Sequence, residues 1–286
     1  MNPDSPAEIR ALLEERGLAL KKRWGQNFLV NRGARQRLVA LLEIRAADTV
    51  WEVGPGLGSM TGLLTERAAR VLAFEVDHGL CRFLRETFGD ATSFTLVPGD
   101  FLETWKSAAA AYGPPDLLLG NLPYRTASLM IADLIEGGLR PRVCVVTVQR
   151  ELAQRMASGP GTKTYSSFSV LCQSCFHVTD RGDLKPGSFY PVPEVVSSIV
   201  EMRPRSDAPD SRTLLVLSAL CRGLFSSRRK TIRNNLASGM LGPNLPGEAV
   251  QAALAAEGID LGSRAEQLSP EIFLRVARAL KGLSAP

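Results

Sequence analysis

The tetrapeptide Asn121-Leu122-Pro123-Tyr124 follows directly on the apolar run 117–120. An amide, a rigid turn and an aromatic ring at the end of a strand can hold an adenine that has left its stack. The Asn121 side-chain oxygen can accept a hydrogen bond from the exocyclic amine, the Leu122 carbonyl can accept a second, and Tyr124 can stack on the base. Pro123 fixes the geometry between these groups. An isolated Asn-x-Pro is more often an ordinary turn, so the motif predicts adenine chemistry only together with other signals.

A glycine-rich turn follows an earlier apolar run, at residues 50–53. Gly54 and Gly56 let the backbone approach a bound ligand closely. The dinucleotide fingerprint G-x-G-x-x-G fails here, because Ser59 stands at its last glycine position. The turn therefore favours a nucleotide-like ligand other than a dinucleotide.

Acidic residues end the next two apolar runs. Glu75 lies about 20 residues after the glycines, where a carboxylate can bind both hydroxyls of a ribose. For Glu75 taken alone, a solvated carboxylate at a strand end is the alternative. Asp100 follows the run 93–98 and can accept a hydrogen bond from an adenine amine, while Phe101 packs on the ring. In open α/β sheets ligands bind beyond the carboxyl ends of the strands, so these positions are predicted to lie at one sheet edge.

These strand-end signals, taken in order, indicate methyl transfer. The set resembles the S-adenosylmethionine-dependent methyltransferases of the Rossmann-like class, and Asn-Leu-Pro-Tyr narrows the resemblance to adenine-N6 enzymes. Over residues 20–281 the chain is similar to the KsgA/RsmA family of ribosomal RNA adenine dimethyltransferases. The further blocks that carry this resemblance are Gly25-Gln26-Asn27-Phe28-Leu29, Gln149-Arg150-Glu151 with Arg155, Phe189-Tyr190-Pro191-Val192-Pro193, and the segment 228–236.

The resemblance implies S-adenosyl-L-methionine as cofactor and no metal. Together with the chemistry of the residues, it gives as cofactor-binding residues Asn27, Leu29, Gly54, Gly56, Glu75, Asp100, Phe101 and Asn121. The catalytic residues are expected to be Asn121, Leu122, Pro123 and Tyr124. The chain departs from the common family residues at 125–128, 166–168 and Val196, which leaves the fine substrate preference open.

The expected mechanism starts from the poor nucleophilicity of the adenine N6 amine, whose lone pair is delocalised into the ring. We infer that the Asn121 oxygen and the Leu122 carbonyl draw the amine hydrogens toward tetrahedral geometry, so that the lone pair points at the methyl group. This is positioning and electrostatic stabilisation rather than acid–base catalysis with a tuned pKa. Two rounds give N6,N6-dimethyladenine.

The formal charge of +5 and the pI near 9.1 favour a polyanionic partner. Two basic segments are expected to contact RNA, with a solvated charged face as the alternative. For the cluster 228–230 an internal brace between a helix and the rest of the domain is a further alternative. Their residues are Lys21, Lys22, Arg23, Arg228, Arg229, Lys230 and Arg233. The expected partner is small-subunit ribosomal RNA in the maturing subunit, bound by a monomer.

Five cysteines without a regular framework indicate a reducing compartment. Cys172-x-x-Cys175 has redox or metal spacing but lacks a second pair, so two buried thiols are preferred. No apolar run is long enough to span a membrane, and the first six residues indicate neither a transit nor a secretory peptide. The expected location is cytoplasmic.

Alternating strand and helix patterns predict an α/β, Rossmann-like class I methyltransferase fold with a mostly parallel, seven-stranded doubly wound sheet and a small all-helical C-terminal domain. The expected strands are 48–53, 70–76, 93–98, 115–120, 142–148, 174–180 and 197–203. The expected helices outside the sheet are 7–20, 211–225, 228–238, 247–257 and 270–281. Three parts are predicted: 1–47, a helical segment covering the cofactor site; 48–205, the methyltransferase domain; and 206–286, a helical RNA-binding domain.

The sequence thus predicts an enzyme that dimethylates N6 of two adjacent adenines in the 3′-terminal stem-loop of small-subunit ribosomal RNA during ribosome biogenesis. One alternative is an Erm-type enzyme that methylates a large-subunit adenine. Another is a non-catalytic nucleic-acid-binding factor on the same fold.

Overall fold

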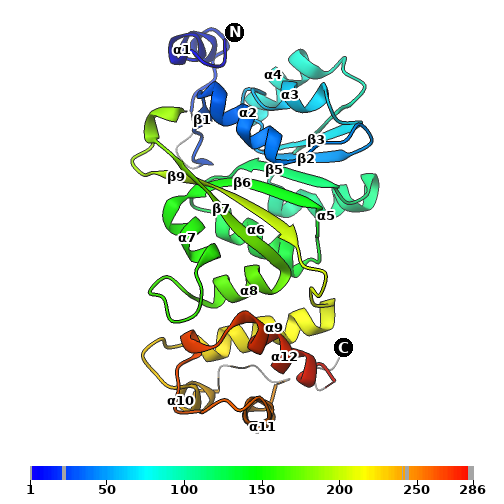
Figure 1. Ribbon diagram of the computed structural model, residues 1–286. Helices are drawn as coiled ribbons and strands as arrows, with labels where there is room; N and C mark the ends of the chain where they lie inside the picture. Colours follow the sequence, from blue (N-terminus) through cyan, green and yellow to red (C-terminus); the bar gives the residue numbers. More distant parts are fainter. Residues whose placement is uncertain (1, 21–23, 240, 242–244, 283–286) are drawn as a thin grey trace. The chain divides into compact units, whose positions relative to one another are not determined.

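A computed structural model of the protein describes residues 2–20, 24–239, 241 and 245–282. Its main sheet has seven strands in the order β4-β3-β2-β5-β6-β9-β7 (Figure 1). Neighbouring strands among the first five of this order pair in parallel, and β9 is antiparallel to β6. The strands are β2 (Thr49–Val53), β3 (Arg70–Glu75), β4 (Phe94–Pro98), β5 (Leu117–Asn121), β6 (Val143–Gln149), β7 (Phe176–Leu184) and β9 (Ser197–Pro204). The predicted mostly parallel, Rossmann-like sheet is confirmed.

A second, two-stranded sheet was not expected. It pairs β1 (Phe28–Leu29) antiparallel with β8 (Phe189–Tyr190). Phe28 lies opposite Tyr190, so two of the sequence blocks that carry the family resemblance, distant along the chain, form one ladder.

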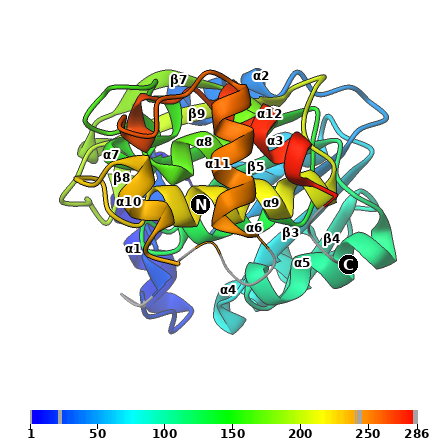
Figure 2. The same ribbon diagram turned by 90° about the horizontal axis from the view of Figure 1, so that it is seen from below.

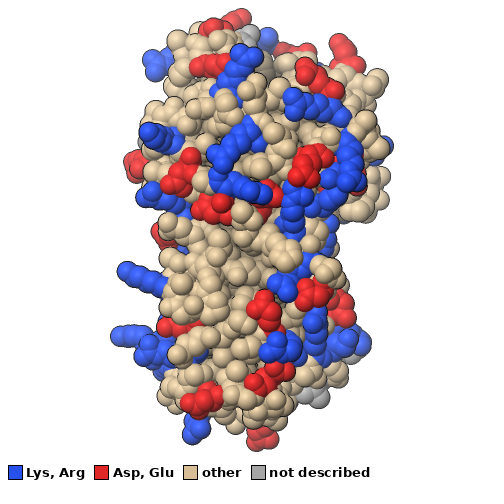
Figure 3. Space-filling view, in the orientation of Figure 1, with Lys and Arg blue, Asp and Glu red and all other residues tan. Residues whose placement is uncertain are grey.

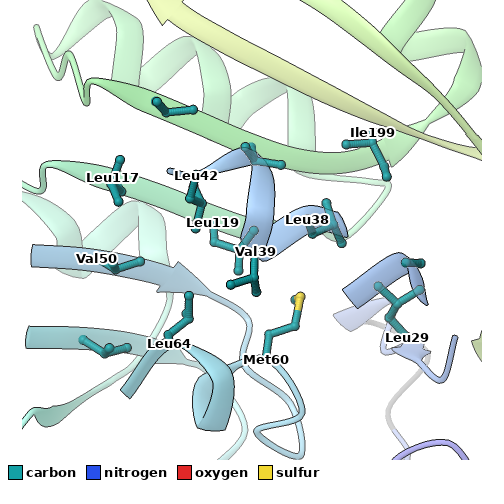
Figure 4. Close-up of a cluster of buried hydrophobic side chains, with 14 of the residues drawn as sticks. Leu29, Leu38, Val39, Leu42, Val50, Met60, Leu64, Leu117, Leu119 and Ile199 are labelled. Carbon is teal, nitrogen blue, oxygen red and sulfur yellow. The ribbon is translucent and has the colours of Figure 1, made fainter. Parts of the chain in front are cut away.

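The helices that follow the strands cover the sheet because the parallel strands are apolar on both faces. Leu38, Val39 and Leu42 pack together with Leu117 and Leu119 of β5 in one buried cluster (Figure 4). The helices are α1 (Pro6–Glu15), α2 (Arg32–Leu41), α3 (Thr61–Thr65), α4 (His78–Phe88), α5 (Phe101–Tyr112), α6 (Ala127–Glu136), α7 (Arg150–Ala157), α8 (Ser167–Cys175), α9 (Ser211–Leu224), α10 (Ile232–Leu236), α11 (Gly247–Ala256) and α12 (Pro270–Leu280).

Two expected helices are wrong in extent. The helix expected over 7–20 ends at Glu15, because Gly17 takes a left-handed φ of 61° and the chain turns there. The helix expected over 228–238 begins only at Ile232. Thr231 caps it, accepting a hydrogen bond from the Asn234 N–H at 3.3 Å, so residues 228–230 lie in a turn before the helix.

The chain forms two compact units, each built from several chain segments. The first takes its described residues from 1–130, 141–153 and 179–203, and the second from 131–140, 154–178 and 204–286. In the second unit α12 packs against α8, α9 and α11 (Figure 2). Cys172 and Cys175 are buried thiols in α8, as preferred from the sequence. The functional division into 1–47, 48–205 and 206–286 stays a prediction.

Candidate active site

A cavity of about 440 Å³ lies in the first compact unit, at the carboxyl ends of the parallel strands. Residues from β2, β3, β5 and β6, or from the loops directly after strands, contribute to its wall. The structure brings together in this wall the predicted residues Asn27, Leu29, Gly54, Gly56, Glu75, Asp100, Phe101, Asn121, Pro123 and Tyr124. Leu122 is absent from the wall.

The glycine turn after β2 has left-handed backbone at Gly54 (φ 71°) and Gly56 (φ 58°). A Cβ atom on Gly56 would lie 2.9 Å from two ring carbons of Phe28, which also lines the cavity. The glycine therefore serves two purposes: it permits the backbone conformation and leaves room for the ring of β1.

We expect Gly56→Ala to lower affinity for the cofactor by about tenfold, equivalent to about 1.4 kcal/mol. The added methyl group must displace Phe28, which forms part of the cavity wall. Gly138→Ala is the matched control, because Gly138 also has a left-handed φ (80°) but nothing lies within 4 Å of its added Cβ. Calorimetric titration of both variants tests this. Equal cofactor affinities in the two variants would show that the position of the Phe28 ring does not affect cofactor binding.

Glu75 is buried at the end of β3 and is held by two backbone groups. Its Oε2 accepts from the Gly56 N–H at 3.2 Å, and its Oε1 accepts from the Asp77 N–H at 2.9 Å. Burial raises the pKa of the Glu75 carboxyl to about 7, because desolvation disfavours its charged form more than the backbone N–H groups of Asp77, Gly56 and Val76 favour it. A buried carboxylate beside the glycine turn has the position and chemistry to accept hydrogen bonds from two hydroxyl groups.

Asp100 and Phe101 form the next part of the wall. Asp100 caps α5, and its Oδ1 accepts from the Leu102 N–H at 2.9 Å. Phe101 is buried and meets the ring of Phe74 edge-on, with ring centroids 5.0 Å apart. One carboxylate oxygen of Asp100 is thus used in capping, and Oδ2 is the oxygen left for a ligand.

The side-chain amide of Asn121 is oriented by the N-terminal segment. Its Nδ2 donates to the Asn27 backbone carbonyl at 2.7 Å. This bond assigns the nitrogen to one side of the amide, so Oδ1 is the acceptor for another group. Gly25 lies beside the same loop, since a Cβ placed on it would be 3.6 Å from the Pro123 Cβ. The tertiary contact with Asn27 thus gives the Asn121 amide a defined orientation.

Leu122 and Tyr124 are fixed in different ways. The Leu122 side chain is buried and its N–H donates to the Thr147 carbonyl at 3.1 Å, which continues the pairing of β5 with β6. The half-buried Tyr124 lines the cavity, and its hydroxyl lies 2.6 Å from Ser197 Oγ. Burial raises the pKa of the Tyr124 phenol, so the hydroxyl stays protonated at neutral pH.

Several cavity residues had no predicted role. Gln149 ends β6 and lies opposite Ser197 of β9, and its place at a strand's carboxyl end is the signal that could have identified it. Gln149 and Phe28 both belong to blocks that carry the family resemblance, which assigned neither of them a role. The other residues of the wall are Trp24, Gly25, Gln26, Val53, Pro55, Ser59, Met60, Phe74, Val76, Leu80, Gly99, Arg125, Thr126 and Met130.

The predicted RNA-binding residues are only partly described. Lys21, Lys22 and Arg23 lie outside the described residues. Arg229, Lys230 and Arg233 are exposed in the second compact unit. On the face drawn in Figure 3, basic and acidic side chains are interspersed.

Arg228 is already engaged within its own unit. Its Nη2 donates to Glu266 Oε2 at 2.8 Å, and its Nη1 donates to the Lys163 carbonyl at 2.8 Å. The Gly161 N–H also donates to the Glu266 carbonyl at 2.7 Å. Arg228 therefore braces the loop 158–165 against the segment around Glu266.

Within the described parts of the chain, no group of three His, Cys, Asp or Glu side chains is placed to hold a metal ion. None of the helices described is both long and apolar enough to cross a membrane.

The chain matches the family model described as ribosomal RNA adenine dimethylase over residues 17–281. A "Ribosomal RNA small subunit methyltransferase A" of Treponema pallidum is 40% identical over 285 residues, covering 99% of this chain and 98% of the relative. That of Treponema denticola is 38% identical over 275 residues, covering 96% and 94%.

Two solved structures have a similar fold. A dimethyladenosine transferase from Plasmodium falciparum shares the fold with a TM-score of 0.71 at 22% identity, covering 86% of this chain and 94% of that one. The 23S rRNA methyltransferase ErmE has a TM-score of 0.65 at 26% identity, covering 88% and 98%. Because the family model matches residues 17–281 and the two relatives are 38–40% identical, the chain belongs to the ribosomal RNA adenine dimethylase family.

Proposed function

We propose that this protein is an S-adenosyl-L-methionine-dependent enzyme that dimethylates N6 of two adjacent adenines in the 3′-terminal stem-loop of small-subunit ribosomal RNA. The observation that carries the proposal is the orientation of Asn121, whose Nδ2 is held by the Asn27 carbonyl while Oδ1 is left as an acceptor at the cavity. The bacterial relatives named small-subunit methyltransferases, similar over nearly their whole length, support the choice of subunit.

The residues of the cavity fit an adenosine-containing cofactor. Glu75 has two carboxylate oxygens beside the glycine turn for the ribose hydroxyls, Asp100 offers Oδ2 to the adenine amine, and Phe101 provides an apolar surface for the ring. The cofactor, when bound, supplies an electrophilic methyl group on a positively charged sulfur. Asn27 and Leu29 belong to the N-terminal segment that closes this part of the wall.

Around the target base, the chain's own residues position the base and polarise its N6 amine. In the first methyl transfer, Asn121 Oδ1 and the Leu122 carbonyl would each accept a hydrogen bond from the N6 amine, which localises its lone pair. The Leu122 side chain is not part of the cavity wall, but its backbone carbonyl lies between the wall residues Asn121 and Pro123. Tyr124 would stack on the flipped base, a gain of roughly 1 to 3 kcal/mol that offsets part of the few kcal/mol of flipping. Pro123 fixes the backbone geometry between these groups.

The RNA backbone would be held outside the cavity by cations. Arg229, Lys230 and Arg233 are proposed to contact phosphates, as are Lys21, Lys22 and Arg23. Arg228 supports this surface indirectly, through the loop 158–165 that it braces.

We expect Arg229→Ala and Lys230→Ala each to reduce the salt slope of RNA binding by roughly 0.7 to 0.9. Arg228→Ala should change the slope less and lower the melting temperature, because its guanidinium already bonds to Glu266 and the Lys163 carbonyl. Arg275→Ala is its control, since Arg275 pairs with Glu257 at 2.6 Å in the same compact unit. Filter binding over a salt series, with melting curves, measures both quantities. If Arg228→Ala reduced the salt slope as much as Arg229→Ala and left the melting temperature unchanged, Arg228 would itself be a phosphate contact.

The choice of substrate is tested by primer extension on both ribosomal subunits, isolated from cells with and without this gene. Dimethyladenine near the 3′ end of small-subunit RNA, present only with the gene, is the expected result. A gene-dependent signal in the large subunit would favour the Erm-type alternative, which the similarity to ErmE keeps in view. A protein that binds no S-adenosylmethionine in a titration would instead be a non-catalytic RNA-binding factor.

The same proposal includes a monomer that acts in the bacterial cytoplasm on the maturing small subunit. It also includes the division of labour between a methyltransferase part, 48–205, covered by 1–47, and an RNA-binding part, 206–286. The position of the cavity residues at the strand ends supports the first part, and the exposed cations of 229–233 support the second.

A further inference from the structure

Ser197 is a buried hydroxyl that neither the family match nor the proposed mechanism assigns a role. It begins β9, is fully buried, and lies 2.6 Å from the hydroxyl of Tyr124, which is 73 positions earlier in the chain. Both residues belong to the first compact unit. The pairing of β9 with β6 sets Ser197 opposite Gln149, another residue of the cavity wall. Ser197 therefore contacts the tip of the aromatic side chain from behind the wall.

We infer that Ser197 is a positioning residue for the target adenine, acting through the ring of Tyr124. This inference rests on the proposed function, in which that ring stacks on the flipped base. A phenol bonded at its far end to a buried strand residue is restricted to one ring position, so the stacking surface exists before RNA arrives. Preorganisation of this kind reduces the ordering cost of binding and keeps the amine at its acceptors.

The neighbouring residue shows that the contact depends on strand geometry. Ser198 is equally buried, but successive residues of a strand point to opposite faces, and its Oγ donates to Asp183 Oδ1 at 2.6 Å. One serine thus anchors Tyr124 and the next anchors Asp183 of β7. The two have the same side chain, burial and number of side-chain partners, which makes Ser198 a matched control for Ser197.

The inference also assigns the Tyr124 hydroxyl a mechanical role. The raised pKa of this phenol keeps it protonated, so it does not serve as a base. Removing the hydroxyl in Tyr124→Phe should then have the same effect as removing its partner in Ser197→Ala. Because each change breaks the same bond, the two effects should not add.

The test measures steady-state methylation of small subunits that lack the modification, with Ser197→Ala, Tyr124→Phe, the double variant and Ser198→Ala. We expect the first three to lose about three- to tenfold in kcat/KM for RNA, by similar amounts, as the loss of one neutral hydrogen bond predicts. Cofactor affinity should stay at the wild-type value. Ser197→Thr, which keeps a hydroxyl, should recover most of the loss.

Ser198→Ala is expected to retain wild-type kcat/KM while lowering the melting temperature about as much as Ser197→Ala. Additive losses in the double variant, or wild-type kinetics for Ser197→Ala, would overturn the inference. So would an equal loss of kcat/KM in Ser198→Ala, since that would indicate a general effect of destabilising β9. If the wild-type protein does not methylate small subunits at all, the proposed function fails instead, and this outcome is visible before any variant is compared.

Discussion

Asn121→Ala lowers the rate of adenine methylation by about 100-fold or more at saturating cofactor, while RNA binding stays nearly intact. This is the expected result if the Asn121 amide is a preorganised acceptor, because removal of such a group typically costs 100- to 1,000-fold. The preorganisation is visible in the bond from Nδ2 to the Asn27 carbonyl, which leaves Oδ1 as the acceptor of a side chain that lines the cavity. Some loss of cofactor affinity is also expected, because the wall around the cofactor includes Asn121.

The variant Asn121→Asp tests separately the two roles of the Asn121 amide, as acceptor for the adenine amine and as donor to the Asn27 carbonyl. The aspartate keeps an oxygen for the amine but places a second oxygen against the Asn27 carbonyl in place of the donor. We expect a rate between those of the wild type and Asn121→Ala. Single-turnover methylation of small subunits at saturating S-adenosylmethionine measures the three rates. A wild-type rate in Asn121→Ala would rule out the acceptor mechanism.

The second large effect concerns Glu75 and pH. Glu75→Gln should weaken S-adenosylmethionine binding at pH 8 by about one to two decades, since charge-assisted hydrogen bonds contribute roughly 1.5 to 3 kcal/mol. The structural reason is that the carboxylate is buried beside the glycine turn, where the backbone N–H groups of Gly56 and Asp77 hold its two oxygens.

The wild-type affinity should also depend on pH in a defined direction. In the protein without bound cofactor, burial raises the pKa of Glu75 to about 7, so the carboxyl is mostly protonated below that pH. Ribose hydroxyls donate to the ionised form, and binding therefore releases a proton. Affinity should fall by up to about tenfold for each pH unit below 7, and should be flat above it. Calorimetry from pH 5.5 to 8.5 measures this slope, which Glu75→Gln should abolish.

Glu52 supplies the control, because its pKa is also raised to about 7 by burial. Its carboxylate accepts from the Thr61 hydroxyl at 2.6 Å, and it does not line the cavity. Glu52→Gln should therefore keep the pH slope of cofactor binding. If the slope vanished in this variant and survived in Glu75→Gln, the titrating group would be Glu52 and the assignment of Glu75 to the ribose would be wrong.

Much of this fold could be predicted from the sequence because its signals are local. Apolar runs of strand length predicted the seven strands of the main sheet. Four of these runs are followed by a glycine turn, an acid or Asn-Leu-Pro-Tyr, which predicted the sheet edge where Glu75, Asp100 and Asn121 meet. Parallel strands are buried on both faces, so their composition alone marks them. The predicted helix ends were less accurate. The turn at Gly17 ends the first helix earlier than predicted, and the cap at Thr231 starts a later helix after its predicted beginning.

The orientation of the site residues was decided by tertiary structure. The Asn27 carbonyl that orients Asn121 is 94 positions away, Ser197 is 73 from Tyr124, and Glu266 is 38 from Arg228. The Phe28 ring over Gly56 likewise depends on the pairing of β1 with β8. The sequence by itself determined which residue types stand at the strand ends, because a strand and its turn are specified by neighbouring residues. Which oxygen, ring or cation remains available to a ligand was settled only by folding, since it depends on partners from distant segments that no local pattern identifies.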